Sequence, residues 1–338
     1  MSMRIALDAM GGDYGPSVVV PAALSALRDH ADLELVLVGV EDSIQGALRE
    51  HGLENEERVS VRPASQVVSS EDDVSQALRN KRDSSIHVGA NLVKEAEVDG
   101  FVSAGNTGAL MAISRLILKT LPGIDRPAIA TFLPTRDSRV LMLDLGANVD
   151  CNSDHLFQFA VMGEVAARAV YGVEEPTIGL LNIGEENIKG NDVVKVAGQL
   201  LRDSEMNYIG NVEGRDIFTG KADVVVADGF VGNVALKTSE GTAELLGHFL
   251  RQAFSASWAS KLAAFMAGRV LKDFKRKADH REYNGAMLLG LNGIVVKSHG
   301  SADSYAFSRA IEVAASEARH SVNRRITHEI QQMLEVAE

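Results

Sequence analysis

The feature that most constrains the fold is a recurring pattern in which a short apolar run ends in a turn rich in glycine and asparagine. Ile5-Ala6-Leu7 leads into the first such turn, and the turns occupy residues 8–16, 103–108, 144–148, 182–186, 228–233 and 298–301. The carboxyl ends of strands in an open parallel α/β sheet line one crevice, so these turns are expected to meet there. Glycine lets backbone N–H groups approach a ligand closely, and a following helix adds partial positive charge. The pattern therefore predicts one anion-binding site built from many strand ends.

Short apolar runs alternate with segments of helical length throughout the sequence. Strands that are apolar at every position are typical of a sheet covered on both faces, and the alternation favours βα units around a mostly parallel sheet. We expect strands at residues 4–7, 34–38, 58–62, 100–102, 128–132, 140–143, 177–181, 208–210, 223–226 and 293–296. We expect helices at residues 16–29, 43–51, 73–81, 87–95, 110–118, 153–171, 190–202, 232–254 and 304–334. No repeat or linker divides the sequence, which predicts a single doubly wound α/β domain over residues 1–338.

Composition excludes several classes of protein. The formal net charge is −12, whereas nucleic-acid binding needs a basic surface that neutralises phosphates. Cys151 is the only cysteine, which rules out an intrachain disulfide and a multi-cysteine metal site and fits a reducing compartment. The first residues do not form a signal peptide, and no apolar run approaches the ~20 residues of a membrane-spanning helix. A globular cytoplasmic protein is expected, with peripheral membrane contact left open.

Residues 251–281 differ from the rest of this acidic chain, because they hold eight Lys or Arg residues and two Asp residues. Apolar side chains fall at helical spacing beside these charges, as in an amphipathic helix. One interpretation is a packed helix with a solvated basic face. The other is a helical excursion that binds an acidic protein partner or an anionic membrane surface. The residues assigned to that surface are Arg251, Trp258, Lys261, Leu262, Phe265, Arg269, Lys272, Lys275, Arg276 and Lys277.

The usual catalytic motifs are absent. The sequence has neither a dinucleotide-binding Gly-x-Gly-x-x-Gly nor a P-loop, and neither a Gly-x-Ser-x-Gly elbow nor His-Glu-x-x-His. Cys151, as a lone cysteine, is more typical of a small buried residue than of a nucleophile. His299 follows an apolar run and is either a hydrogen-bond or proton donor in the crevice or a structural histidine. Lys189 precedes a helix and either binds an anion there or solvates the surface.

The glycine turns and their neighbours form an ordered set of motifs. They are Leu7-Asp8-Ala9-Met10-Gly11-Gly12-Asp13, Ser103-Ala104-Gly105-Asn106-Thr107-Gly108-Ala109, Asp144-Leu145-Gly146-Ala147-Asn148, Leu181-Asn182-Ile183-Gly184-Glu185-Glu186, Asp228-Gly229-Phe230-Val231-Gly232-Asn233, Tyr283-Asn284-Gly285-Ala286, Leu288-Leu289-Gly290 and His299-Gly300-Ser301. One motif alone is unspecific, but in this order and spacing the whole chain resembles the PlsX family of bacterial phosphate acyltransferases. The chain departs from many members of that family at Asn284, where they have glycine, and at Ala302, where they have serine.

The resemblance implies a doubly wound α/β fold related to isocitrate and isopropylmalate dehydrogenases and to phosphotransacetylases. It implies transfer of a long-chain acyl group from the thioester of acyl carrier protein to inorganic phosphate, which yields acyl phosphate. It also implies a homodimer that associates peripherally with the inner face of the cytoplasmic membrane and passes its product to a glycerol-3-phosphate acyltransferase. No metal or organic cofactor is expected.

In such a reaction phosphate is the nucleophile, and the protein positions two reactants and stabilises a tetrahedral oxyanion. We expect phosphate to meet backbone N–H groups at residues 11–12 and 105–108, helped by Lys189. Asparagine side chains would orient the substrates or bind the oxyanion, and His299 would protonate the leaving thiolate. The residues expected to be catalytic are Lys189, His299, Asn233 and Asn182, and those expected to bind substrate are Asp8, Gly11, Gly12, Asp13, Gly105, Asn106, Thr107, Gly108, Asn148, Glu185 and Asp228.

Two other classes of function stay open at this point. Related folds host nicotinamide-dependent decarboxylating dehydrogenases, and fold alone does not determine function. That class lacks support here because the sequence has no dinucleotide signature. A non-catalytic scaffold that recruits lipid-synthesis enzymes to a membrane is the second alternative, and the many polar glycine turns argue against it because they indicate a site.

Overall fold

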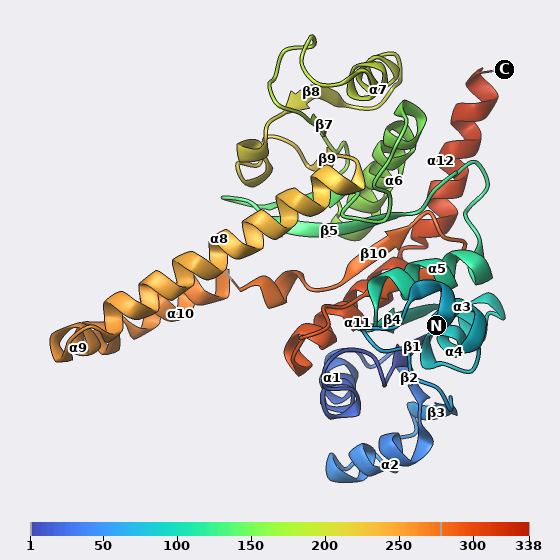
Figure 1. Ribbon diagram of the computed structural model, residues 1–338, viewed down its shortest axis with the longest axis vertical. Coiled ribbons are helices and arrows are strands. Elements are labelled where there is room, and N and C mark those ends of the chain that lie inside the picture. Colours follow the sequence, from blue (N-terminus) through green and yellow to red (C-terminus); the bar gives the residue numbers. More distant parts are fainter. Residues whose placement is uncertain (1, 278, 338) are drawn as a thin grey trace.

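The computed structural model describes residues 2–277 and 279–337, with side chains described except at 273–277, 280 and 333–337. Across the described residues, one eleven-stranded sheet runs in the order β3-β2-β1-β4-β11-β10-β5-β6-β9-β7-β8 (Figure 1). The strands are β1 (Met3–Asp8), β2 (Leu33–Gly39), β3 (Val59–Pro63), β4 (Gly100–Ser103), β5 (Ala128–Pro134), β6 (Arg139–Leu143), β7 (Ile178–Leu181), β8 (Tyr208–Val212), β9 (Val224–Val226), β10 (Ala286–Leu289) and β11 (Ile294–Lys297). The helices are α1 (Pro16–Asp29), α2 (Glu41–Glu50), α3 (Val74–Asn80), α4 (Ser85–Lys94), α5 (Thr107–Leu118), α6 (Ser153–Tyr171), α7 (Asp192–Arg202), α8 (Gly229–Ser255), α9 (Trp258–Met266), α10 (Gly268–Lys277), α11 (Ser304–Arg319) and α12 (Val322–Ala337).

The sheet consists of two parallel halves that run in opposite directions. β1, β2, β3, β4 and β11 pair in parallel, as do β6, β7, β8 and β9. Between the halves, β10 pairs antiparallel with β11 and β5, and β5 pairs antiparallel with β6. The expected mostly parallel sheet is confirmed. The reversal places the strand ends of the two halves in two groups, rather than along the single edge that the sequence suggested.

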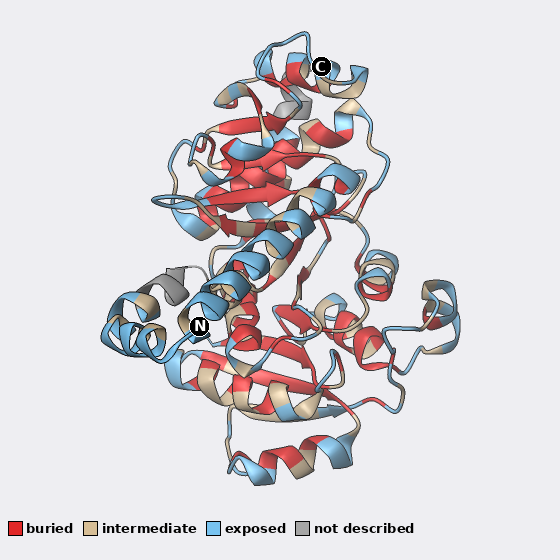
Figure 2. Cartoon of the chain, turned by 60° about the vertical axis from the view of Figure 1, so that its left-hand side comes forward, coloured by how far each residue is buried: buried red, intermediate tan, exposed pale blue. Residues whose placement is uncertain are grey.

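Side chains of consecutive strand residues are buried on opposite faces of the sheet. In β1, Ile5 and Leu7 belong to the core formed with α1, α2 and α11, whereas Ala6 belongs to the core formed with α4 and α5. In β9, Val224 packs in the core with α6 and α12, and Val225 packs on the other face. Figure 2 shows the buried sheet between layers of partly exposed helices. The doubly wound α/β fold follows from this burial on both faces.

The secondary structure largely matches the sequence expectations. Each expected strand is present within two residues, and the expected helices are present within three residues, apart from the last helix. The expected helix at 304–334 is wrong, because α11 ends before Ser321, whose φ of 51° is incompatible with a helix, and α12 begins afterwards. The strand β10 was not expected. It is a four-residue strand directly before Gly290, and its antiparallel pairing depends on contacts distant in sequence.

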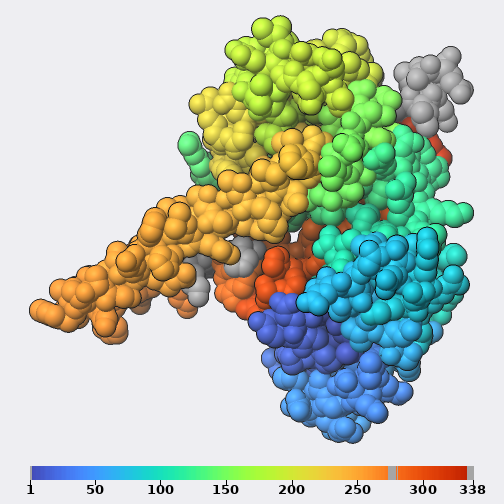
Figure 3. All heavy atoms as spheres, viewed as in Figure 1, coloured from blue at the N-terminus to red at the C-terminus, as the bar shows by residue number. Residues whose placement is uncertain are grey.

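The far part of α8, together with α9 and α10, projects from the body; we call residues 241–277 the arm. Figures 1 and 3 show α8 leaving the body, with α9 at its far end. Within α8, every residue of which the structure describes, Gly229 and Gly232 are the buried residues. Among the described residues, no helix has both the length and the apolarity that crossing a membrane requires.

Candidate functional site

The turns that follow β1, β4 and β11 meet at one end of the first half of the sheet. β1 pairs with β4 and β4 pairs with β11, with Ser103 opposite Lys297. We call residues 8–13, 103–108 and 297–301 the glycine-turn cluster. Three of the turns that the sequence singled out are therefore brought together.

Two glycines of the first turn are required by close contacts. A Cβ atom on Gly11 would lie 2.5 Å from Oδ2 of Asp8. Gly12 has a φ of +79°, and a Cβ atom there would lie 2.8 Å from the carbonyl oxygen of Gly300. The backbone N–H of Asp13 donates to the same oxygen at 2.9 Å. Because only glycine fits these positions without displacing its neighbours, the turns pack backbone against backbone.

Asp8 links the first two turns of the cluster. Its side chain is buried, and Ser103 Oγ donates to its Oδ2 at 2.6 Å. The backbone N–H of Met10 donates to Oδ1 at 3.1 Å, and that of Gly105 donates to Ser103 Oγ at 3.0 Å. Burial raises the pKa of Asp8. The carboxyl group thus holds the turns together, and its direct contact with a substrate stays a prediction.

The second turn leads into α5, where three predicted binding residues lie. Oδ1 of Asn106 accepts the backbone N–H of Ala109 at 3.0 Å, and its Nδ2 donates to the carbonyl oxygen of Ser70 at 3.2 Å. Asn106 is therefore the N-cap of this helix. Thr107 and Gly108 are exposed in the first helical turn, where backbone N–H groups lack partners within the helix.

Lys297 is a residue of this cluster that the sequence analysis missed. Its Nζ donates to the carbonyl oxygen of Ala104 at 3.3 Å and to that of Ser298. Burial lowers the pKa of Lys297 to about 8, although the negative charge of Asp8 acts in the opposite direction. The positive charge of Lys237 lowers it further. The available signal in the sequence was a single lysine at the end of a continuously apolar strand.

Asn284 fixes the turn that carries His299. Its Nδ2 donates to Ser298 Oγ at 2.8 Å and to the carbonyl oxygen of Ala306 at 2.7 Å, while its Oδ1 accepts the backbone N–H of His299 at 3.0 Å. Nδ1 of His299 lies 2.9 Å from Oγ of Ser301. The asparagine that departs from the family pattern is therefore a structural support of the third turn, and His299 is exposed above it.

A second group of turns follows β6, β7 and β9; we call residues 144–148, 182–191 and 228–233 the asparagine-turn cluster. Asn148 is buried, and its Nδ2 donates to Oδ2 of Asp144 at 2.9 Å and to the carbonyl oxygen of Pro127 at 2.7 Å. Both amide hydrogens of Asn148 are thus engaged within the protein. Its role in substrate binding stays a prediction, in which Oδ1 of Asn148 would contact the substrate.

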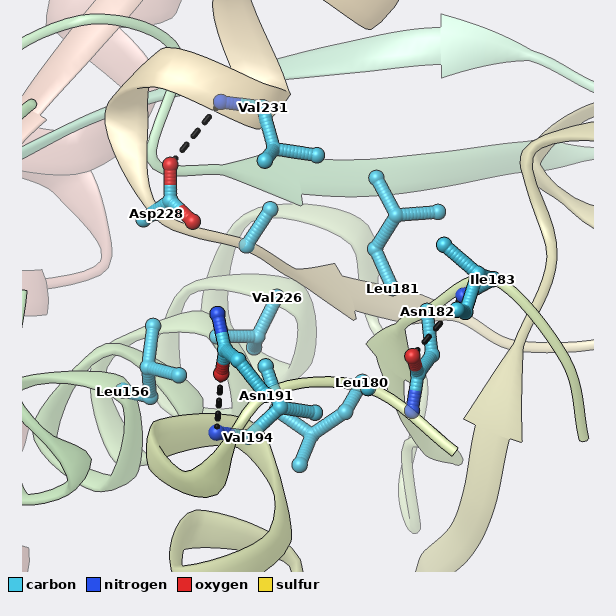
Figure 4. Close-up of a pocket in the computed structure, with 12 residues that line it drawn as sticks. Leu156, Leu180, Leu181, Asn182, Ile183, Asn191, Val194, Val226, Asp228 and Val231 are labelled. Atoms are coloured by element: carbon cyan, nitrogen blue, oxygen red, sulfur yellow. Dashed lines mark hydrogen bonds between the residues drawn. The ribbon is translucent and has the colours of Figure 1, made fainter. Parts of the chain in front are cut away.

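A pocket of about 240 Å³ lies in the asparagine-turn cluster (Figure 4). Nδ2 of Asn182 donates to the carbonyl oxygen of Lys189 at 3.2 Å, and Oδ1 of Asp228 accepts the backbone N–H of Val231 at 2.8 Å. Apolar walls with a few polar groups suit a ligand that carries an apolar chain. The pocket is lined by Leu156, Leu180, Leu181, Asn182, Ile183, Gly190, Asn191, Val194, Val226, Ala227, Asp228 and Val231.

The exposed turn after β7 carries two more predicted residues. Glu185 accepts a hydrogen bond from Nζ of Lys221 at 2.7 Å, so its carboxylate is already paired. Lys189 is exposed on the same turn. The structure therefore places Lys189 in the asparagine-turn cluster, whereas the sequence assigned it to the glycine turns.

The first turns of α8 connect the two clusters. A Cβ atom on Gly146 would lie 3.5 Å from Cγ of Asn233, which places this predicted catalytic residue against the turn after β6. Lys237 follows one turn later on the same helical face, and its charge acts on Lys297. α8 thus joins two sets of turns that the reversal of the sheet separates.

Cys151 does not have the properties of a catalytic nucleophile. Burial raises the pKa of its thiol to about 11, and the thiolate is the reactive form of cysteine. Among the residues that the structure describes, no group of three or more His, Cys, Asp or Glu side chains could hold a metal ion.

The arm presents the predicted partner or membrane surface. Trp258 and Phe265 are 80% and 84% exposed, and Leu262 is 52% exposed. The basic residues Arg251, Lys261, Arg269 and Lys272 are also exposed. The side chains of Lys275, Arg276 and Lys277 lie outside the described residues.

The fold places the protein in a class of known architecture. A phosphotransacetylase from Streptococcus pyogenes superposes with a TM-score of 0.61 at 18% identity, over 94% of each chain. A branched-chain phosphotransacylase from Enterococcus faecalis superposes with a TM-score of 0.61 at 13% identity, over 94% of this chain and 99% of the other. At these identities the likeness shows the fold alone, which is the α/β fold found in phosphotransacylases.

Sequence comparison then defines the family. The model of a family described as fatty acid synthesis protein matches residues 3–325. A protein named phosphate acyltransferase from Alkalilimnicola ehrlichii is 57% identical over 100% of this chain and 98% of its own, and one from Paraburkholderia phytofirmans is 54% identical over 98% and 90%. The chain belongs to this family, the PlsX family of phosphate acyltransferases, and it is an acyltransferase.

Proposed function

We propose that the protein transfers a long-chain acyl group from the thioester of acyl carrier protein to inorganic phosphate and releases acyl phosphate for phospholipid synthesis. The observation that carries the proposal is full-length similarity to proteins named phosphate acyltransferase. Two features support it: a cluster of glycine turns beside a lysine, which suits a small anion, and a mostly apolar pocket in the neighbouring cluster. The high pKa of Cys151 favours direct attack by phosphate over a covalent acyl-enzyme.

In this reaction a phosphate oxygen attacks the thioester carbonyl, and the tetrahedral intermediate collapses with loss of the carrier thiolate. We place phosphate in the glycine-turn cluster and the apolar acyl group in the pocket at Asn182. Asn182, Asn233 and Lys189 then orient the donor and stabilise the oxyanion, and His299 protonates the departing thiolate. Each of these assignments is a proposal that substitution can test.

The first experiment measures release of free carrier-protein thiol from long-chain acyl carrier protein, with and without phosphate, while hydroxylamine traps acyl phosphate. Phosphate-dependent thiol release with an equal amount of trapped product is the expected result. If a folded protein gives neither thiol release nor trapped product, the proposal is contradicted. Nicotinamide binding would then favour the dehydrogenase. Partner recruitment that is lost in a catalytically active surface variant would show a scaffold role.

We propose that the arm serves both the acidic carrier protein and the cytoplasmic face of the membrane. Its basic side chains suit the carrier and anionic headgroups, and its exposed Trp258, Leu262 and Phe265 suit the acyl region of a bilayer. The proposal also includes a homodimer of single-domain subunits that binds the membrane peripherally, next to a glycerol-3-phosphate acyltransferase. Crosslinking tests the homodimer, and vesicle sedimentation tests membrane binding.

A further inference from the structure

The inference drawn from Lys297 rests on the proposed function and concerns the residue that binds the phosphate of that reaction. We propose that the ammonium group of Lys297 binds the phosphate acceptor directly within the glycine-turn cluster. This assigns to Lys297 the role that the sequence gave to Lys189, which lies on the turn after β7 in the other cluster.

The hydrogen bonds of Lys297 to carbonyl oxygens use two of the three donors of its ammonium group. An ammonium group has three donors. Two carbonyl oxygens, those of Ala104 and Ser298, accept from Nζ, and they belong to the turns after β4 and β11. Within the described part of the chain, no carboxylate forms an ion pair with Lys297. One donor therefore remains for a ligand held between the turns.

The charge around Lys297 favours the same ligand. Asp8 and Asp13 act to raise its pKa and Lys237 acts to lower it, yet burial outweighs the two acids. The carboxyl group of Asp8 is itself buried and held by Ser103. A partly buried cation without a paired counter-ion is unfavourable, and an arriving phosphate would supply the negative charge through a charge-assisted hydrogen bond.

Some backbone N–H groups of the glycine-turn cluster, among them that of the predicted donor Gly105, are engaged within the protein. The N–H groups of Met10, Asp13 and Gly105 are already engaged by Asp8, Gly300 and Ser103, respectively. These three N–H groups hold the turns together, and the ammonium group of Lys297 adds a positive charge to whatever backbone donors remain. Lys297 is placed between two of these turns.

Calorimetric titration of inorganic phosphate into the full-length protein tests the inference. Loss of a charged donor predicts about 10- to 100-fold weaker phosphate binding in Lys297→Met. The KM for phosphate should rise by a similar factor, and the KM for acyl carrier protein should change less than twofold. Lys297→Arg should retain most of the affinity. Lys94→Met, which removes an exposed lysine at the end of α4, is the matched control.

Unchanged phosphate affinity in a folded Lys297→Met protein would overturn the inference, as would a rise confined to the KM of the acyl donor. Should this variant fail to fold, Lys297→Gln, which removes the charge and keeps a polar side chain, is titrated in its place. Unchanged phosphate affinity in a folded Lys297→Gln protein would overturn the inference. Phosphate binding through Lys297 without thiol release would instead contradict the proposed reaction and leave the phosphate site standing.

Discussion

The two ends of α8 belong to different environments. At its start, a Cβ atom on Gly232 would lie 1.9 Å from the carbonyl oxygen of Asp144, so the helix docks backbone to backbone on the turn after β6. Further along, Gly241 has nothing within 4 Å of such an atom. Apolar side chains such as Phe249, 53% exposed, face outward in the second part. The difference shows that one continuous helix joins a base required by packing to an arm that this chain alone leaves uncovered.

The largest difference in stability is expected between two variants that each add one methyl group to α8, one at Gly232 and one at Gly241. Gly232→Ala should destabilise the protein by about 3–5 kcal/mol, because backbone atoms have to move to relieve the overlap. Gly241→Ala should stabilise the helix by about 0.5–1 kcal/mol, because alanine has the higher helix propensity. Urea unfolding of both variants measures the free energy of unfolding. Equal effects at the two positions would break the distinction between base and arm.

The sequence predicted the strands of this fold because a strand buried on both faces carries a continuous apolar run, as Ile5-Ala6-Leu7 in β1 and Val224-Val225-Val226 in β9 do. It did not predict β10 or the reversal of the sheet, since antiparallel pairing with β5 and β11 depends on distant contacts. The glycine turns could be identified in the sequence because close backbone contacts, such as those of Gly11 and Gly12, require glycine at these positions. Lys297 was missed because its burial follows from the meeting of three turns, and a single residue type gives no signal of that.

The second prediction concerns the pH dependence of stability. The pKa of Lys297 is lowered from 10.5 to about 8 in the folded protein, and below about pH 8 the charged group carries its full burial penalty. Between about pH 8 and 10.5 the unfolded chain binds more protons, so the free energy of unfolding should rise with pH. Relative to Lys297→Met, wild type should gain up to about 3 kcal/mol across this window.

Urea unfolding at pH 7, 8, 9 and 10 measures this difference. Lys261→Met, which removes an exposed lysine from the arm, is the control for Lys297→Met in the glycine-turn cluster. A difference between wild type and Lys297→Met that does not vary with pH would contradict the assigned burial. A similar pH dependence for Lys261→Met would show that the effect is not specific to the glycine-turn cluster.

A smaller effect is expected when the hydroxyl group of Ser103, which joins two turns of the glycine-turn cluster, is removed. Ser103→Ala removes a donor to Oδ2 of the buried Asp8 carboxyl group and the acceptor for the backbone N–H of Gly105. We expect a loss of about 1–3 kcal/mol, measured by the urea midpoint. In the arm, Ser257→Ala removes the N-cap of α9, whose Oγ accepts the backbone N–H of Ser260 at 3.0 Å, and should cost about 1 kcal/mol. A larger loss for Ser257→Ala would reverse the comparison.

The smallest effect on stability is expected at the apolar surface of the arm, where function should change instead. Leu262→Glu should alter the free energy of unfolding by less than about 0.5 kcal/mol, because Leu262 is exposed. Its sedimentation with vesicles that contain anionic lipid should fall at least about tenfold, because a charge replaces apolar area that would enter the bilayer.

Val196→Glu on α7 is the matched control for the vesicle experiment, since Val196 is 50% exposed and Leu262 is 52% exposed. It adds the same charge to the molecule at a similar exposure but outside the arm, so its vesicle binding should equal that of the wild type. Equal losses in the two variants would mean that net charge controls binding. Wild-type sedimentation of Leu262→Glu would exclude insertion of this surface and leave the basic side chains of the arm for a protein partner.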